Sequence, residues 1–206
     1  MTKTNNKGFT LWFTGLPCSG KSTLAELVAA ELRRRGRFVE ILDGDEVRKS
    51  LTKGLTFSRE DRDENIRRIG FVCRLLSRNG VVAIAAAISP YRSVRDEVRA
   101  GHANFVEAYV ETPLELCIER DVKGMYKKAL AGEMKHFTGV DDPYEAPATP
   151  EITIRTQEES PEQSAARILA RIEQLGLTEP GHSPAYTDEE AEKIRERLTR
   201  LGYIEQ

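Results

Sequence analysis

The sequence predicts an α/β fold in which a parallel sheet lies between helices on both of its faces. Short apolar segments alternate with segments of helical period, and this alternation favours parallel strand pairing with a helix in each crossover. Residues 81–88 are apolar at every position, as expected for a strand that is buried on both faces. We therefore expect a three-layer sandwich around a five-stranded parallel sheet, with strands at residues 11–13, 38–42, 81–88, 105–110 and 152–154.

The helices are predicted from periodicity and from signals at their ends. Apolar residues at helical spacing between residues 24 and 32 predict a first helix that follows a Gly-rich turn. Ser58, with Asp61 three residues later, predicts the cap of a long helix that ends at residues 79–80. Further helices are predicted over residues 91–100, from Pro113 onward and over residues 161–175.

Composition excludes several classes of protein. The chain has 206 residues, 39% of them hydrophobic and 31% charged, which suits one domain with a short appendage rather than a disordered chain. Its 31 Lys and Arg against 33 Asp and Glu leave a net charge of −2, so nucleic acid is not expected as the main partner. No apolar run is long enough to cross a membrane, and the polar start lacks the apolar segment of a secretion signal. The three widely spaced cysteines predict neither a disulfide framework nor a zinc site, so we expect a cytoplasmic protein.

Residues 121–150 break the alternation of strands and helices. Lys, Gly and Pro replace the apolar period over a stretch that is long for a connection within a compact domain, and we interpret it as a functional lid. Positive charge on a lid suits closure over an anionic ligand such as a phosphate. The basic residues of the lid region are Arg120, Lys123, Lys127, Lys128 and Lys135.

Residues 178–206 differ in character from the rest of the chain. Pro and Gly in residues 178–185 predict a linker, and Thr187 with Glu190 predicts the capping box of a C-terminal amphipathic helix. We expect this helix to dock on its own domain or on a second copy rather than on another protein. The chain is therefore divided into a domain of residues 1–177 and a linker with a helix over residues 178–206.

Residues 15–22 match the phosphate-binding loop (P-loop) pattern, and Thr23 extends it. Its glycines let backbone N–H groups turn toward phosphate oxygens, and the helix that follows adds its positive N-terminus. Lys21 supplies a cation for the β- and γ-phosphates, and the Ser22 hydroxyl suits Mg²⁺. The predicted ATP-binding residues of the loop are Gly15, Leu16, Pro17, Cys18, Ser19, Gly20, Lys21, Ser22 and Thr23.

A P-loop alone leaves a GTPase-type switch and a small-molecule kinase open. The chain has no Asn-Lys-x-Asp motif for reading guanine, and its one Asp-x-x-Gly match, residues 121–124, lies in the lid. A kinase needs a carboxylate near the γ-phosphate, and Asp43-Gly-Asp45 follows the second predicted strand directly. Asp45 is a candidate base or a holder of the metal's water shell, or else only a turn residue that caps a helix. Arg48, one turn later, either pairs with an anionic substrate or faces solvent.

The long helix carries further candidates. Arg62, Asn65 and Ile69 share one face by their spacing of three and four residues. Phe57, just before the predicted cap, is either a hydrophobic staple or an aromatic plate for a base, and periodicity alone does not decide between them.

Several motifs together resemble the adenylylsulfate kinases (APS kinases), over roughly residues 8–176. The resemblance is carried by residues 11–23, by Leu42-Asp-Gly-Asp-Glu-Val-Arg48, by Phe57-Ser-x-x-Asp-Arg62 with Glu64-Asn-Ile-Arg-Arg68, by Ile88-Ser-Pro-Tyr-Arg92 and by the lid phrases at residues 120–128, 137–139 and 142–145. It implies transfer of the ATP γ-phosphate to the 3′-hydroxyl of adenylylsulfate (APS) with Mg²⁺, giving 3′-phosphoadenylylsulfate (PAPS) in sulfate assimilation.

The resemblance also implies roles for single residues. Lys21, Asp45 and Ser89 become the catalytic candidates. In some family members the serine at the Ser89 position has been discussed as a phosphate acceptor. We do not expect that step on the main reaction path. Arg120 is expected against bound ATP, and Phe57 and Phe137 are expected to sandwich the adenine of APS. The APS-binding candidates are Asp45, Arg48, Phe57, Arg62, Asn65, Ile88, Ser89, Lys123, His136 and Phe137.

Partners and alternatives follow from the same comparison of motifs. The resemblance implies a homodimer and leaves a contact between the tail and a separate ATP sulfurylase open, because many relatives are fused to one. Glu46 stands where the family often has Asn. The alternatives are another small-molecule kinase, for nucleoside monophosphates or gluconate, and an ATP-binding regulatory subunit without turnover.

Overall fold

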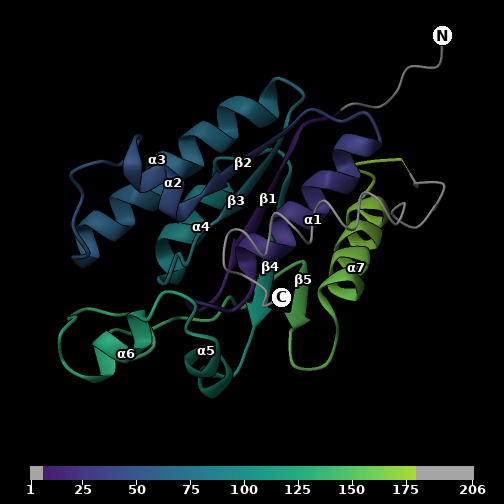
Figure 1. Cartoon of the computed structure of the whole chain (residues 1–206). Coiled ribbons are helices and arrows are strands. Elements are labelled where there is room, and N and C mark those ends of the chain that lie inside the picture. Colours follow the sequence, from purple (N-terminus) through teal and green to yellow (C-terminus); the bar gives the residue numbers. More distant parts are fainter. Residues whose placement is uncertain (1–6, 180–206) are drawn as a thin grey trace, which may run out of the picture.

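A five-stranded parallel sheet forms the middle layer of the structure (Figure 1). The computed structural model describes residues 7–179. Leu11 on the central strand lies opposite Ile84 on one neighbour and Val106 on the other. The strands are β1 (Phe9–Thr14), β2 (Val39–Asp43), β3 (Val82–Ala86), β4 (Phe105–Glu111) and β5 (Ile152–Arg155), in the order β2-β3-β1-β4-β5. The predicted parallel sheet is confirmed.

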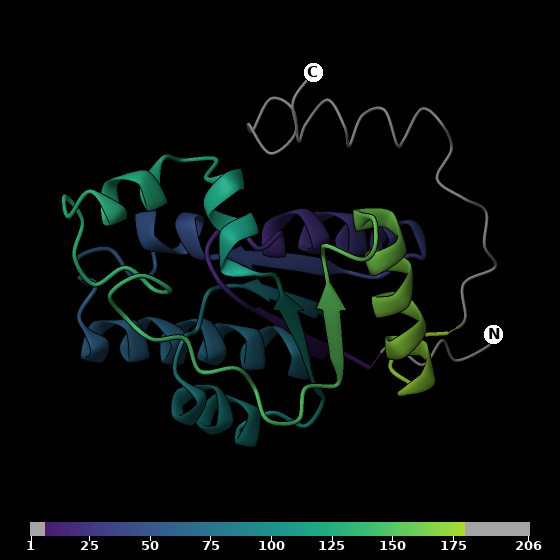
Figure 2. The ribbon, with the colours of Figure 1, turned by 90° about the horizontal axis from the view of Figure 1, so that it is seen from below.

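Helices cover both faces of this sheet (Figure 2). One face packs against α1 (Lys21–Arg34) and α7 (Pro161–Gln174), and the other against α3 (Arg59–Arg78) and α4 (Arg92–Ala100). The predicted three-layer sandwich is therefore confirmed. Three shorter helices belong to connections that leave the carboxyl ends of strands, namely α2 (Gly44–Lys49), α5 (Leu114–Arg120) and α6 (Met125–Leu130).

The central strand contributes to both halves of the core. Every residue of β1 is buried, and successive side chains of a strand point to opposite faces. Leu11 and Phe13 accordingly pack with α1 and α7, whereas Trp12 packs with α3 and α4. Because β1 is fixed from both sides, the loop that follows it starts from a rigid position.

The helix ends largely follow the predicted signals. The Ser58 hydroxyl accepts a hydrogen bond from the Asp61 N–H and caps α3 as predicted. Ser160 and Gln163 form a capping box at the start of α7. Pro113 is the residue before α5 rather than its first residue.

Three other predictions differ from the structure or lie outside it. The strand predicted over residues 81–88 ends at Ala86, because the chain turns away there and Ser89 adopts a positive φ of 43°. The lid, predicted without regular structure, contains the six-residue helix α6. The helix predicted in the tail falls within residues 180–206 and lies outside the described residues. None of the helices within residues 7–179 combines the length and the apolar character needed to cross a bilayer.

The contact between α3 and α4 generates a stability prediction. A Cβ added at Gly70 would lie 2.7 Å from both γ-carbons of Val98. Alanine normally stabilises a helix by about 1 kcal/mol relative to glycine, but overpacking a core costs about 1–3 kcal/mol. We therefore expect Gly70→Ala to lower the free energy of unfolding, measured with denaturant.

The double variant Gly70→Ala/Val98→Ala provides the control, because it removes the colliding methyl groups. Its free energy of unfolding should fall by less than the sum of the decreases in the two single variants. A Gly70→Ala protein that is as stable as the parent would show that the two helices are not packed this closely.

Candidate active site

The P-loop follows β1 and its shape depends on glycine at two positions. Gly15 has a φ of 154° and Gly20 a φ of 103°, both in the region that residues with a Cβ rarely adopt. At Gly15 a Cβ would also come within 2.5 Å of the Val110 carbonyl oxygen. The Thr112 hydroxyl, just after β4, donates to the Ser19 carbonyl at 3.2 Å. The loop is thus held against the end of the neighbouring strand.

Lys21 is a buried cation at the end of the P-loop, and its side chain turns back into the loop. Its ammonium donates to the carbonyl oxygens of Leu16 at 2.6 Å and Gly15 at 3.1 Å, and to the Ser19 hydroxyl at 3.3 Å. Burial lowers the pKa of Lys21 to about 8 from the usual 10.5, while the nearby Asp43 and Asp45 carboxylates oppose this shift. A phosphate group would offer the ammonium the full negative charge that these neutral oxygens lack.

The two carboxylates after β2 have different positions. Asp43 accepts a hydrogen bond from the Ser22 hydroxyl at 2.6 Å and another from the Asp45 N–H at 2.9 Å, so Asp43 caps α2. The alternative interpretation, a cap formed by Asp45, is therefore wrong. The side chain of Asp45 is largely exposed and forms an ion pair with Lys123 of the lid. Asp43, the first residue of the Asp-Gly-Asp motif, is therefore a further functional candidate that the motif alone does not single out.

Phe57 and Arg48 lie together at the entrance to α3. The Phe57 ring is 55% exposed, and the Arg48 guanidinium lies over it at 4.5 Å from the ring centre. Residue 62, where a hydrophobic staple would need an apolar partner, is an arginine whose Nε donates to the Phe57 carbonyl. Phe57 is therefore presented as an open aromatic surface. Burial, together with the nearby Arg62 charge, lowers the pKa of Arg48, while the Asp45 and Asp61 carboxylates oppose this shift.

Arg62 joins α3 to the far part of the lid. Its guanidinium donates to the Thr138 hydroxyl at 2.6 Å and to the His136 carbonyl, and it forms an ion pair with Asp142 at 3.2 Å. Asn65, one turn further on, is buried, and its Oδ1 has no hydrogen-bond partner within residues 7–179. A buried acceptor without a donor is costly, so Asn65 is suited to a ligand hydroxyl or amine.

The turn after β3 brings Ile88 and Ser89 to the same edge of the sheet. The Ile88 carbonyl accepts a hydrogen bond from the Thr14 hydroxyl at 2.8 Å. The Ser89 hydroxyl is buried, accepts from the Trp12 indole N–H at 3.1 Å and donates to the Ala87 carbonyl at 3.3 Å. These contacts support a role for Ser89 in shaping the turn.

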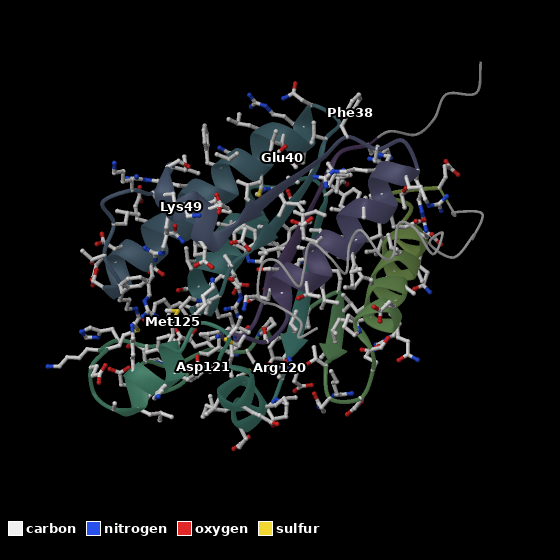
Figure 3. All side chains as sticks on the ribbon, in the orientation of Figure 1. Phe38, Glu40, Lys49, Arg120, Asp121 and Met125 are labelled. Carbon is white, nitrogen blue, oxygen red and sulfur yellow. The ribbon has the colours of Figure 1, made fainter. Side chains whose placement is uncertain are left out.

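The lid residues predicted to contact substrates occupy two different environments. His136 is exposed, whereas Phe137 is 5% exposed and packs edge-on against Tyr126 of α6. Arg120, at the end of α5, reaches the Cys18 and Ser19 carbonyls at 3.4 and 3.5 Å. Figure 3 shows Arg120, Asp121 and Met125 at the edge of the sheet that carries the lid, far from Phe38 and Glu40.

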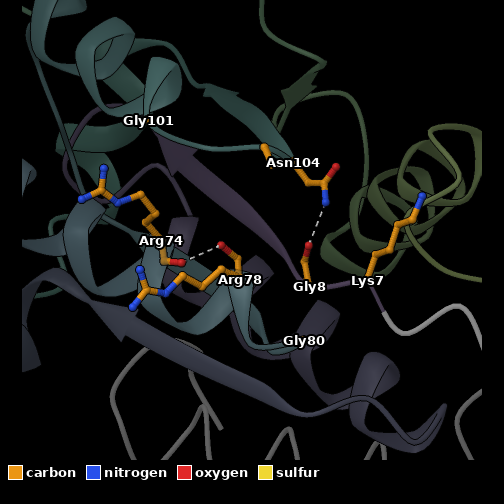
Figure 4. A pocket seen from close by; sticks show the side chains of 9 residues that line it. Lys7, Gly8, Arg74, Arg78, Gly80, Gly101 and Asn104 are labelled. Carbon is orange, nitrogen blue, oxygen red and sulfur yellow. Dashed lines mark hydrogen bonds between the residues drawn. The ribbon is translucent and has the colours of Figure 1, made fainter.

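A hollow at the opposite end of the sheet is separate from this site (Figure 4). It lies between the start of β1 and the end of α3, and Gly8, Arg74 and Arg78 are among its lining residues. None of the predicted site residues lines it. All of the predicted site residues instead follow the carboxyl ends of strands, lie at the start of α3 or belong to the lid region.

No cluster of His, Cys, Asp and Glu side chains that could hold a metal by itself is found within residues 7–179. The Ser22 hydroxyl and the Asp43 carboxylate, 2.6 Å apart, are nevertheless the hard oxygen donors that Mg²⁺ prefers. Such a site needs only one or two protein oxygens when phosphates supply the others.

Comparison with known proteins identifies the family of the chain. The family model "Adenylylsulphate kinase" matches residues 7–155. The adenylyl-sulfate kinase of Rippkaea orientalis (strain PCC 8801 / RF-1) is 58% identical over 170 residues, which cover 82% of this chain and 94% of that protein. The "Probable bifunctional SAT/APS kinase 2" of Sorangium cellulosum (strain So ce56) is 59% identical over 169 residues, 82% of this chain and 29% of that longer protein.

A solved structure shows the same relationship. The Mycobacterium tuberculosis APS kinase CysC, in complex with AMPPNP and APS, is 42% identical to this chain and superimposes with a TM-score of 0.79. The match covers 81% of this chain and 98% of that one.

The buried state of Lys21 predicts a pH dependence of nucleotide binding. With a pKa of about 8, the free protein loses the ammonium charge as the pH rises through that value. Bound phosphate favours the charged form and raises this pKa, so binding above about pH 8 takes up a proton and weakens as the pH rises. We expect the dissociation constant of ADP, measured by calorimetry without metal, to rise by up to about tenfold per pH unit above pH 8.

Lys21→Met is the control for this measurement. It should bind ADP weakly and without this pH dependence, because the titrating group is gone. A parent protein whose ADP affinity stays level between about pH 7 and pH 9.5 would contradict the assignment.

Proposed function

The chain belongs to the adenylylsulfate kinase family, and we propose how its own residues carry out the reaction of that family. The reaction transfers the γ-phosphate of ATP to the 3′-hydroxyl of APS and yields ADP and PAPS, a step of sulfate assimilation. One observation carries the residue assignment. The P-loop lysine, the two carboxylates after β2 and a lid lysine meet at one edge of the sheet, where Ser22 pairs with Asp43 and Lys123 with Asp45.

The P-loop binds the phosphates of ATP in this proposal. Residues 15–23 supply backbone N–H groups and the N-terminus of α1, and Lys21 exchanges its carbonyl partners for the β- and γ-phosphates. Arg120 lies beside the Cys18 and Ser19 carbonyls and faces the nucleotide. Phosphoryl transfer depends mainly on positioning and charge neutralisation, and these cations provide both.

Mg²⁺ is the proposed cofactor, held by the Ser22 hydroxyl with Asp43 behind it. When bound, the ion neutralises the charge that develops on the transferring phosphoryl group. Asp43 orients the Ser22 hydroxyl and also fixes the first turn of α2. One carboxylate thereby couples the metal site to the position of Asp45.

The acceptor end lies between α2, α3 and the lid. Asp45 accepts the proton of the attacking 3′-hydroxyl. Lys123, which pairs with Asp45 in this structure, remains close to the anionic groups of the substrates. The exposed Phe57 ring and the lid residue Phe137 hold the adenine, and Asn65 offers its unpaired oxygen to the ribose. Arg48, Arg62 and His136 surround the sulfate and phosphate groups, with Ile88 and Ser89 forming the floor at the end of β3.

Ser89 is proposed to position the site rather than to carry phosphate. Its hydroxyl is 1% exposed and engaged by Trp12 and Ala87, so it would have to leave these partners to reach a phosphate. Its carbonyl accepts a hydrogen bond from the buried Arg95 at 2.6 Å, which supports the unusual turn.

We further propose that the chain acts in the cytoplasm as a homodimer and contacts an ATP sulfurylase.

The metal proposal predicts the effect of Asp43→Asn. The amide can still accept the Ser22 hydroxyl, but it lacks the charge that supports a divalent cation. We expect the Mg²⁺ concentration for half-maximal activity to rise by about 10- to 100-fold, measured by magnesium titration at saturating ATP and APS.

Asp96→Asn, an exposed change on α4, serves as the matched control and should leave the titration unchanged. An Asp43→Asn enzyme with the magnesium dependence of the parent would exclude Asp43 from the metal site.

The acceptor proposal predicts the effect of Phe57→Ala. Loss of a stacking contact with a base costs about 1–3 kcal/mol, so KM for APS should rise by about 5- to 150-fold while KM for ATP stays within about twofold. Phe71→Ala is the matched control, because Phe71 is also half-exposed, at 53%, but lies on the outer part of α3. Equal effects of the two variants on KM for APS would remove the base-stacking role.

A panel of acceptors tests the function itself. ADP release from Mg-ATP should depend on APS and not on gluconate, shikimate or nucleoside monophosphates. APS-independent ADP release, or stimulation by one of the other acceptors alone, would favour a different small-molecule kinase. ATP binding without turnover on any acceptor would favour a regulatory subunit.

A further inference from the structure

Tyr126 is a buried lid residue whose contacts reach the P-loop. It lies on α6 with 0% of its surface exposed, and its hydroxyl donates a hydrogen bond to the Pro17 carbonyl at 3.2 Å. Burial raises the pKa of Tyr126, so the hydroxyl remains a donor through the physiological range. The hydrogen bond joins two segments that are 109 residues apart in the chain.

The opposite side of Tyr126 contacts the proposed adenine site. Its ring meets the Phe137 ring edge-on, with 4.9 Å between the ring centres. Tyr126, Phe137, Cys117 and Ala129 form a small core of their own, against which the P-loop side chains Leu16 and Cys18 pack. This lid core is therefore built on the tip of the P-loop and is separate from the two cores of the sheet.

Close packing leaves the lid core little freedom to slide over the P-loop tip. A Cβ added at Gly139, two residues after Phe137, would come within 3.0 Å of a methyl carbon of Leu16. Gly139 also has a φ of 91°, so the turn after Phe137 requires glycine both for its backbone conformation and for the space beside Leu16. A shift of the P-loop tip must therefore be passed on to this turn.

The P-loop tip also contacts the lysine that is proposed to bind phosphate. Lys21 donates to the carbonyls of Gly15 and Leu16, directly before the Pro17 carbonyl that Tyr126 holds. A phosphate that drew the Lys21 ammonium away would leave these carbonyls without their cation, so the tip would be free to adjust. The Tyr126 hydroxyl and the Leu16 side chain then carry this adjustment to the lid core.

We propose that Tyr126 is a positioning residue that couples nucleotide binding at the P-loop to APS binding at Phe137. The proposal rests on the proposed function, because it takes Phe137 as part of the APS site. Coupling of this kind is reciprocal, so ADP and APS change each other's affinity by the same factor. In this proposal Tyr126 is buried behind both binding sites and acts through its contacts with Pro17 and Phe137.

The test compares Tyr126→Phe with Tyr109→Phe. Both changes remove one phenolic oxygen, but Tyr109 lies on β4 outside the lid core, where its ring stacks on Tyr144. The dissociation constant of APS is measured by calorimetry with and without saturating ADP, which forms no product. The quantity of interest is the factor by which ADP changes APS affinity.

We expect ADP to tighten APS binding in the parent and in Tyr109→Phe, and Tyr126→Phe to reduce this factor by about three- to tenfold, the worth of one buried hydrogen bond. A merely loosened fold would weaken both ligands and lower the melting temperature without changing the factor.

Two results would overturn the inference. The first is a parent protein in which ADP does not change the affinity for APS, and the second is a Tyr126→Phe protein in which ADP changes it by the same factor as in the parent. Failure of APS to bind the parent, while ADP still binds, would instead remove the acceptor assignment on which the inference rests. The two kinds of failure are therefore distinguishable.

Discussion

The structure of the site depends on one buried cation. Lys21 keeps its ammonium in a nearly closed environment because carbonyl oxygens of its own loop surround it. That arrangement requires the backbone turns at Gly15 and Gly20, and these in turn require a rigid β1 and a helix that begins at Lys21. An isolated buried charge is costly, so the loop is shaped for an anion that can replace the neutral oxygens.

In the proposed mechanism the other cations, like Lys21, exchange protein partners for substrate groups. Lys123 pairs with Asp45, and Arg62 with Asp142, so the lid lies over the carboxyl edge of the sheet through contacts that an anionic substrate would also make. In this proposal, substrate binding replaces the carboxylate partners of these cations with anionic groups of the substrate. Positioning groups are then already close to their working places, which lowers the entropic cost of closure.

Much of the fold could be predicted because its signals are local. Apolar period, the Ser58 cap and the P-loop motif each lie within a short stretch of sequence, and the elements that they predict are present. The contact between Ser22 and Asp43 could not be predicted in this way, since it depends on β1 and β2 being placed on either side of β3. Helix α6 is not predictable from periodicity, because its six residues are too few for a period to appear. Tyr126 lies within the lid phrase at residues 120–128, but its role could not be predicted, because that role depends on a contact with Pro17 across the fold.

The identity of the phosphorylated atom tests the central claim most directly. The enzyme is incubated with Mg-ATP and APS, and the product is examined by phosphorus and proton NMR. The proposed site predicts one new phosphate on the 3′-oxygen of APS for each ADP released. ADP formation without a phosphate on APS, or a phosphate on another atom, would contradict the placement of the acceptor beside Asp45.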